Sequence, residues 1–332
     1  MRQPEVARLA RLLLALVLVL PLLDAGRSMV VAGLFLAEFL GHDAQPLSRL
    51  TSAPSRSAIA VPSASVDRYV QPRRRGVPLV LVHGLAPDGK DDVRVSAAAA
   101  LLARAGFDVA VPTIPGLTRL RLRPADRDPV LATIAARSGP TVVVGVSVGA
   151  GVAVLAASDP AVRDRIPLVL SLGGYGSAID LVRYYLTGEY RGPDGAVRRR
   201  THDPALIQAF VDANRDLLDP SAQRALGATE PGDVAHALSR LSPEIAGLFD
   251  SVSPSRVVRD LRGTLILVHG RDDPAVPYTE SIALATARPT RSRLVLVGVV
   301  DHVEPSARIA MASAVRDLAA MWTVAYALIS HA

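Results

Sequence analysis

Short, uninterrupted apolar runs of strand length recur along this chain, and helical patterns separate most of them. Strands that are covered on both faces in a parallel sheet are apolar throughout, whereas strands with one wet face alternate. Strand and helix patterns in alternation therefore predict an α/β domain built on a doubly wound, mostly parallel sheet. The clearest runs are Pro78–His83, Thr141–Val146, Pro167–Leu172 and Thr264–His269.

This alternation stops over residues 175–262, where the pattern is mostly helical, is punctuated by Asp, Pro and Gly, and includes several tyrosines. It resumes at residue 264 and continues towards the C-terminus. We therefore expect residues 65–332 to form the α/β domain and residues 175–262 to be a helical cap inserted over the sheet edge.

The composition supports a large core and excludes several kinds of site. Half of the 332 residues are apolar and 20% are charged, which argues against bulk disorder. The absence of cysteine excludes disulfides, thiolate metal sites and a cysteine nucleophile. The net charge is +6, but the arginines are scattered and lack the interleaved aromatic residues of nucleic-acid-binding surfaces, so we expect no nucleic-acid partner.

The N-terminal 40 residues are hydrophobic apart from a few charges. Three arginines, the last at Arg11, precede an apolar run over residues 12–23, and a second run covers residues 29–37. Positive charge before a short apolar stretch is typical of a secretory signal, and the first run is shorter than the ~20 residues that a spanning helix needs. We expect residues 1–40 to be a membrane anchor or signal segment; helices lying in the membrane interface, or packed on the domain, are the alternatives.

An uncleaved anchor is favoured, because Leu23-Asp24-Ala25 is a mediocre cleavage site. Arginines that precede an anchor stay on the cytoplasmic side, so this interpretation predicts a membrane-associated protein whose larger part is extracytoplasmic. Cleavage would instead give a secreted protein. Residues 41–64 are rich in Ser, Ala and Pro without a periodic pattern, and we expect them to be a linker.

A serine lies between two glycines where the clearest strand meets a helix of small residues. The stretch Gly145–Gly149 has the pattern Gly-x-Ser-x-Gly, which places a nucleophilic serine on a sharp strand-to-helix turn. The glycines are required because neighbouring backbone approaches too closely for a β-carbon. The motif alone arises by chance in about one chain in ten of this length. Its position between strand and helix makes Ser147 a candidate nucleophile.

Further polar side chains follow two strand patterns later in the chain. Asp272 and Asp273 come directly after the run 264–269, and His302 follows the strand pattern 293–297. The carboxyl ends of parallel strands lie at one edge of the sheet, where ligands bind in open α/β folds. There, a histidine can accept the serine proton while a carboxylate orients it and stabilises the imidazolium.

These residues, with the stretch Leu79–Ala86 and the Gly-x-x-Asp-x-x-Val-Pro pattern around Asp273, resemble the α/β-hydrolase superfamily. The resemblance covers about residue 77 to the C-terminus, the insertion excepted. It implies the α/β-hydrolase fold and a catalytic triad of Ser147, Asp273 and His302 in the order typical of that family. Asp273 is preferred to Asp272 because it matches the family spacing to Val276-Pro277.

The resemblance also implies an oxyanion hole made by the backbone N–H groups of Val148 and Leu85. His83 and His269, each at the end of a strand, are expected to be buried structural residues rather than metal ligands. We expect neither a cofactor nor a metal.

The resulting hypothesis is a serine hydrolase that cleaves a carboxylic ester, or a related acyl bond, through an acyl-enzyme. The apolar residues and tyrosines of the insertion suggest a hydrophobic small-molecule substrate, as for a carboxylesterase or lipase. Peptidase, thioesterase and acyltransferase activities remain alternatives within the fold. A catalytically silent hydrolase-fold protein that binds a lipid or a partner at the membrane is the alternative from another class. The sequence does not indicate the oligomeric state.

Overall fold

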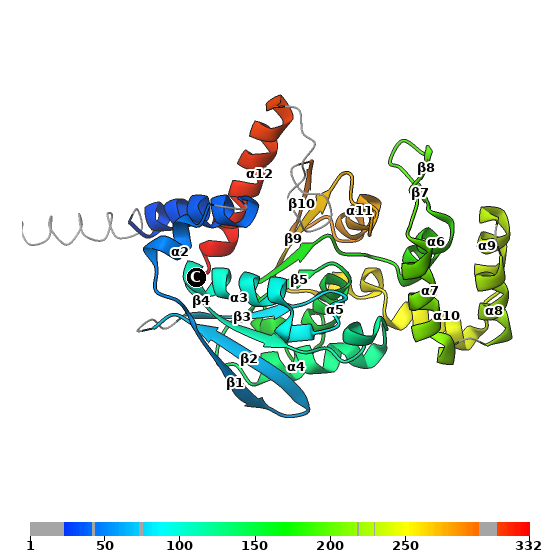
Figure 1. Cartoon of the computed structure of the whole chain (residues 1–332), viewed down its shortest axis with the longest axis horizontal. Coiled ribbons are helices and arrows are strands. Elements are labelled where there is room, and N and C mark those ends of the chain that lie inside the picture. The colour runs from blue at the N-terminus through cyan, green and yellow to red at the C-terminus, as the bar shows by residue number, and fades with distance from the viewer. Residues whose placement is uncertain (1–22, 42–43, 73–75, 218, 229, 299–310) are drawn as a thin grey trace, which may run out of the picture.

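The computed structural model describes residues 23–41, 44–72, 76–217, 219–228, 230–298 and 311–332, which form an eight-stranded sheet with helices on both faces (Figure 1). In spatial order the strands are β1 (Ser55–Val61), β2 (Ala64–Val70), β4 (Phe107–Pro112), β3 (Val77–Val82), β5 (Val142–Val146), β6 (Leu168–Leu172), β9 (Thr264–Gly270) and β10 (Ser292–Val297). Strand β1 is antiparallel to β2 and β2 to β4, whereas all pairs from β4 to β10 are parallel. The predicted doubly wound, mostly parallel sheet is confirmed.

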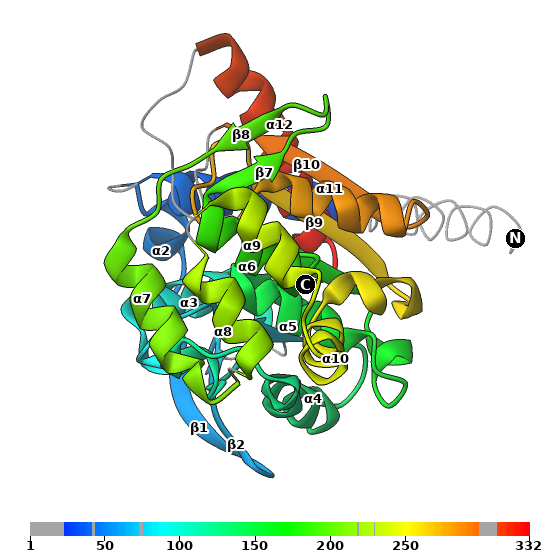
Figure 2. The same cartoon turned by 90° about the vertical axis from the view of Figure 1, so that its right-hand side faces the viewer.

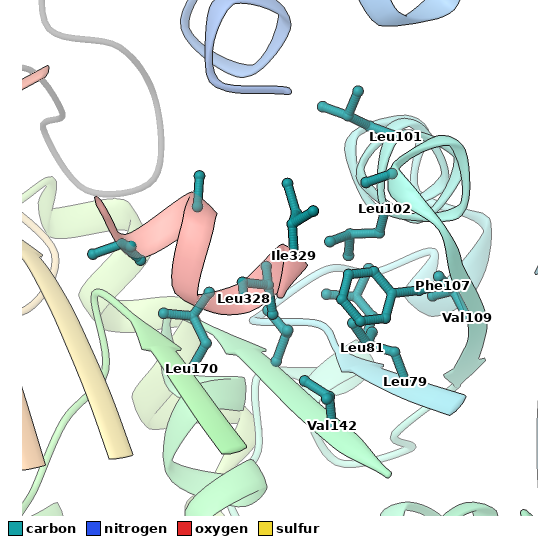
Figure 3. Packing of buried hydrophobic residues seen from close by; sticks show 14 of the residues in the cluster. Leu79, Leu81, Leu101, Leu102, Phe107, Val109, Val142, Leu170, Leu328 and Ile329 are labelled. Atoms are coloured by element: carbon teal, nitrogen blue, oxygen red, sulfur yellow. The ribbon is translucent and has the colours of Figure 1, made fainter. Parts of the chain in front are cut away.

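The central strands are apolar throughout because helices cover both faces of the sheet. Every residue of β4 is buried, and in β9 only Thr264 is exposed. In β3, Leu79 and Leu81 point into one core and Val80 and Val82 into the other. Figure 3 shows the first of these cores, where Leu79 and Leu81 lie close to Phe107.

Helices of the α/β domain cover both faces of the sheet. One layer packs on the Leu79 face of the sheet and the other on the Val80 face. The first layer contains α3 (Val93–Ala105) and α12 (Met311–Ile329); the second contains α4 (Asp128–Ala135), α5 (Val148–Ala157) and α11 (Tyr278–Ala287). Single 3₁₀ turns lie at Gly89–Asp91, Leu117–Arg119, Pro124–Arg127, Arg163–Arg165, Arg215–Leu217, Pro254–Arg256 and Val258–Asp260.

Residues 23–40 are helical and pack on the α/β domain beside α12 (Figure 1). Ala32 and Leu36, one helical turn apart, are buried in the same core as α3 and α12, and Trp322 Nε1 donates a hydrogen bond to the Met29 carbonyl (3.3 Å). Across the described ranges, no helix combines the length and the apolar character needed to span a membrane. Residues 1–22, which carry nearly all of the first apolar run, lie outside the described residues.

The prediction of a linker over residues 41–64 is wrong, because most of this segment belongs to the domain. It contains α2 (Pro46–Leu50), which packs on α3, and the edge strand β1, which pairs with β2 over its whole length. A tight turn at Ser63 (φ 59°) joins the two strands. The strand escaped prediction because β1 is an exposed edge strand, and only its last part, around Val61, is buried in apolar surroundings.

Residues 175–262 form helices and one hairpin, which Figure 2 shows facing the viewer. The hairpin, over residues 189–199, was not anticipated from the sequence. The elements are α6 (Ala178–Thr187), β7 (Glu189–Arg191), β8 (Val197–Arg199), α7 (Pro204–Ala213), α8 (Pro220–Gly227), α9 (Pro231–Leu238) and α10 (Pro243–Ser251). We call this segment the cap.

Candidate active site

Ser147 occupies the sharp turn between β5 and α5 with an unusual backbone conformation, φ 55° and ψ −135°. Side-chain-bearing residues rarely adopt such angles, which cost about 1–3 kcal/mol and persist only where the surroundings enforce them. Two backbone hydrogen bonds hold this conformation: the Ser147 N–H donates to the Leu172 carbonyl (2.8 Å), and the Ala150 N–H donates to the Ser147 carbonyl (2.9 Å). The turn is therefore fixed from β6 on one side and from α5 on the other.

The glycines around Ser147 are needed for close packing. A β-carbon at Gly149 would lie 1.9 Å from the His83 carbonyl oxygen, and one at Gly145 would lie 2.5 Å from the Ala150 Cα. A β-carbon at Gly84, in the loop after β3, would lie 3.0 Å from the Ser147 Cβ. The start of α5 thus rests directly on the loop after β3, which brings Val148 and Leu85, the two predicted oxyanion donors, to neighbouring backbone segments.

His83 fixes the orientation of the peptide that carries the Leu85 N–H. Its Nε2 accepts a hydrogen bond from the Ile114 N–H (3.0 Å), so the ring proton is on Nδ1, which donates to the Gly84 carbonyl (2.7 Å). Burial lowers the pKa of His83, which keeps the ring neutral in this role. In a trans peptide the N–H points opposite to the C=O, so the Leu85 N–H is directed away from His83. This buried histidine is structural, as its sequence position indicated.

Of the two neighbouring carboxylates after β9, Asp273 points inward and Asp272 points outward. The Asp273 side chain is fully buried, and its Oδ1 accepts the N–H groups of Ala275 (2.8 Å) and Val276 (2.9 Å). The Asp272 side chain is 71% exposed and pairs with Arg200 of the cap (2.8 Å). The backbone of the turn that follows therefore orients the Asp273 carboxylate.

His269 contacts the Asp273 carboxylate, which sequence reasoning missed. Its Nε2 lies 2.9 Å from the Val276 carbonyl and 3.3 Å from Asp273 Oδ2, and its Nδ1 lies 2.7 Å from Ser281 Oγ. A carbonyl cannot donate, so Nε2 carries the proton and Nδ1 accepts from the Ser281 hydroxyl. The spacing of four residues between His269 and Asp273 is the only sequence signal of this contact.

His302 lies outside the described residues, as does the whole segment 299–310. Strand β10 ends at Val297, and the next N–H, of Gly298, donates to Asp317 Oδ2 of α12 (2.6 Å). Ser147 and Asp273 follow the carboxyl ends of the parallel strands β5 and β9, at one edge of the sheet. The triad as a whole therefore remains a prediction.

An apolar cavity lies between the two predicted oxyanion segments and the cap. Leu85, Leu122 and Val148 line it together with residues of the cap, among them Leu181, Tyr185 and Phe249. None of the described lining residues is charged.

Among the described lining residues, Asn214 carries the only side-chain amide, and this amide is occupied. Its Nδ2 donates to the carbonyls of Leu120 (2.9 Å) and Phe210 (2.7 Å), and its Oδ1 accepts from Arg123 (2.6 Å). The cavity is therefore suited to a hydrocarbon group. Within the described part of the chain, no three His, Asp or Glu side chains are grouped so that they could hold a metal ion.

The sequence matches no protein-family profile and no curated protein. Among solved structures it is similar to a puromycin-hydrolyzing peptidase of Mycobacterium tuberculosis, at 18% identity and a TM-score of 0.51, over 84% of this chain and 39% of that one. A puromycin hydrolase gives 17% identity and a TM-score of 0.51, over 83% and 39%. Est1E from Butyrivibrio proteoclasticus gives 15% identity and a TM-score of 0.48, over 84% and 98%.

The chain spans about two fifths of the length of the first two proteins. At these identities the likeness concerns the fold. Together with the strand order and the turn at Ser147, it confirms that this chain has the α/β-hydrolase fold.

Proposed function

We propose that this chain is a serine hydrolase that cleaves a carboxylic ester, or a related acyl bond, with Ser147 as the nucleophile, His302 as the base and Asp273 as the acid. The observation that carries the proposal is the backbone of Ser147, held at φ 55° between β5 and α5 by two hydrogen bonds and closely packed through the glycines around it. A turn of this kind exposes a serine hydroxyl at the carboxyl edge of the sheet. Core packing alone gives no reason for a strained serine at this position.

In the proposed reaction, His302 removes the proton from Ser147 Oγ, which attacks the carbonyl carbon of the substrate. The N–H groups of Val148 and Leu85 hold the oxyanion that forms. Donors of this kind lower the activation barrier by about 3 kcal/mol each. The imidazolium then protonates the departing alcohol. Water, activated by the same histidine, hydrolyses the acyl-enzyme and regenerates Ser147.

The cavity favours an ester with a hydrocarbon acyl group over a peptide. A peptide brings N–H and C=O groups, and burying each without a partner costs about 1–3 kcal/mol. Among the described lining residues only Asn214 has an amide, and it is already bonded to Leu120, Phe210 and Arg123. A hydrophobic small-molecule ester is therefore the proposed substrate, and carboxylesterase or lipase-like activity the proposed class.

Labelling with a fluorophosphonate tests this function against a catalytically silent, ligand-binding protein. We expect the full chain to be labelled covalently and Ser147→Ala to lose the label, while Ser138→Ala, at an exposed position, keeps it. Wild-type protein that is folded but unlabelled would exclude the hydrolase and favour the binding protein. Hydrolysis of p-nitrophenyl esters compared with peptide p-nitroanilides then separates esterase from peptidase activity.

We also propose that the N-terminal segment associates with a membrane. The apolar run over residues 12–23, with Arg11 before it, supports this, and so does the exposure of Leu23, Met29 and Val30 on the helix that follows. The intact mass of the protein from a carbonate-washed membrane fraction tests it. A mass lacking the first residues, or absence from that fraction, would favour the secreted form.

A further inference from the structure

Two cap residues contact the acid loop, which we define as residues 270–277, on both sides of Asp273. The Tyr184 hydroxyl donates a hydrogen bond to the Pro274 carbonyl (2.9 Å). The Arg200 guanidinium pairs with the Asp272 carboxylate (2.8 Å). The second contact is largely exposed, and such pairs contribute little. The Tyr184 contact is part-buried: Tyr184 itself is only 1% exposed, whereas Pro274 is exposed.

The acid loop connects the Pro274 carbonyl directly to the groups that orient the Asp273 carboxylate. Asp273 Oδ1 is held by the N–H groups of Ala275 and Val276, the residues that follow Pro274. A shift of the Pro274 peptide therefore moves the two donors that orient Asp273. Since the Tyr184 hydroxyl holds that peptide from the cap side, the position of the acid depends on a residue outside the sheet and its connecting loops.

Tyr184 is itself rigidly held. Its ring packs edge-on against His202 (4.5 Å between ring centroids) and against Tyr190 (5.8 Å), and the His202 Nε2 lies 3.1 Å from the Tyr184 carbonyl. Burial and the nearby Asp273 charge raise the pKa of Tyr184, so the phenol stays protonated and remains a donor. The hydroxyl is thus a fixed donor at all pH values where the enzyme would work.

The helix that carries Tyr184 also forms a wall of the apolar cavity. Leu181 and Tyr185 of α6 line that cavity, whereas the hydroxyl of Tyr184, between them in sequence, reaches the acid loop. Helix α6 therefore lies between the substrate cavity and the acid. If α6 shifts when a ligand fills the cavity, the Pro274 peptide and the Asp273 carboxylate would move with it.

We propose that Tyr184 is a positioning residue for the catalytic acid: by holding the Pro274 carbonyl it sets the orientation of Asp273 and couples it to the cap that forms the acyl cavity. This proposal rests on the proposed function, in which Asp273 orients His302 and stabilises the imidazolium. The cap then positions the catalytic acid as well as covering the substrate.

The test compares Tyr184→Phe with Tyr190→Phe in the full chain. Both changes remove one hydroxyl and keep the ring, but Tyr190 belongs to the hairpin, where its ring contacts Tyr184 and Tyr278. The readouts are p-nitrophenyl acetate hydrolysis as a function of pH and the rate of fluorophosphonate labelling, with circular dichroism to establish folding.

For Tyr184→Phe we expect kcat and the labelling rate to fall about five- to tenfold, the effect of one hydrogen bond. The acidic limb of kcat/KM should move to lower pH by about half a unit, because a misplaced carboxylate stabilises the imidazolium less. KM for this short ester should change less than twofold, and Tyr190→Phe should behave as the wild type. If Tyr184 only stabilised the fold, Tyr184→Phe would leave the acidic limb of the kcat/KM profile at its wild-type pH.

Two outcomes would overturn the proposal, and they differ in what else they overturn. If Tyr184→Phe is folded and keeps the wild-type kcat, labelling rate and pH limb, this inference fails while the hydrolase function stands. If the wild-type protein shows no Ser147-dependent labelling, the proposed function fails and the inference fails with it. Should Tyr184→Phe be unstable at the assay temperature, its pH profile is measured at a lower temperature at which circular dichroism shows it folded, and the same shift of the pH limb must appear there.

Discussion

Gly149→Ala adds one methyl group at the tightest contact of the proposed active site. The new β-carbon would lie 1.9 Å from the His83 carbonyl oxygen and 2.6 Å from its carbonyl carbon. Ordinary contacts begin at 3.4 Å, so the two backbones would have to separate by about 1.5 Å. Neither atom belongs to a flexible side chain, and the separation must therefore move the loop after β3 or the start of α5.

Both segments carry a proposed oxyanion donor, Leu85 in the loop and Val148 at the start of α5. Misplacing a reacting group by about 1 Å can cost 100-fold in rate, and removing one donor costs about 100- to 1,000-fold in kcat. We therefore expect Gly149→Ala to lower kcat for p-nitrophenyl butyrate by at least about 100-fold. Overpacking should also lower the free energy of unfolding by about 1–3 kcal/mol.

The control is Gly232→Ala in α9, where a β-carbon would meet nothing within 4 Å. It should leave kcat unchanged and hold or slightly raise stability, because alanine is the better helix former. Urea unfolding at the assay temperature separates loss of the site from loss of the fold. A folded Gly149→Ala protein with kcat within threefold of the wild type would refute the view that this contact fixes the oxyanion hole.

Three further predictions follow from buried groups near the site and from the cavity. His269→Leu removes the Nε2–H that lies beside Asp273, and should lower kcat about tenfold and stability by about 1–3 kcal/mol, measured by ester hydrolysis and urea unfolding. Across p-nitrophenyl esters of increasing acyl chain length, kcat/KM should rise about fourfold per CH₂ until the cavity is full. Leu248→Trp, which narrows the cavity, should shift the optimal chain length to shorter esters. An unchanged optimum would place the acyl group elsewhere. Burial raises the pKa of Glu280 above its usual 4.5, so ionisation opposes folding and stability falls as the pH rises through and above that value. Glu280→Gln, which keeps an acceptor for the Gly176 N–H, should therefore be more stable than the wild type at pH 7 but not at pH 4.

The central sheet could be predicted from the sequence because its strands are buried on both faces. Such burial leaves an uninterrupted apolar run, and the four clearest runs correspond to β3, β5, β6 and β9. The edge strand β1 leaves no such trace, since most of its residues are exposed. The apolar run over residues 29–37 leaves its role open for a different reason: Ala32 and Leu36 pack on the domain, whereas Met29 and Val30 are exposed, and both uses give the same apolar pattern.

The candidate site shows the same division between local and long-range information. Ser147 could be identified because the close packing around its turn requires glycine two residues before it and two residues after it, and Gly145 and Gly149 leave a readable motif. The contact of Tyr184 with Pro274 joins residues 90 positions apart, and no pattern in either segment encodes it. Residues that carry out the chemistry lie at turns and strand ends, where the backbone demands particular residue types. Residues that position them are defined only by the tertiary packing, and so a local motif can reveal the proposed triad but not the cap residue that we propose to hold its acid in place.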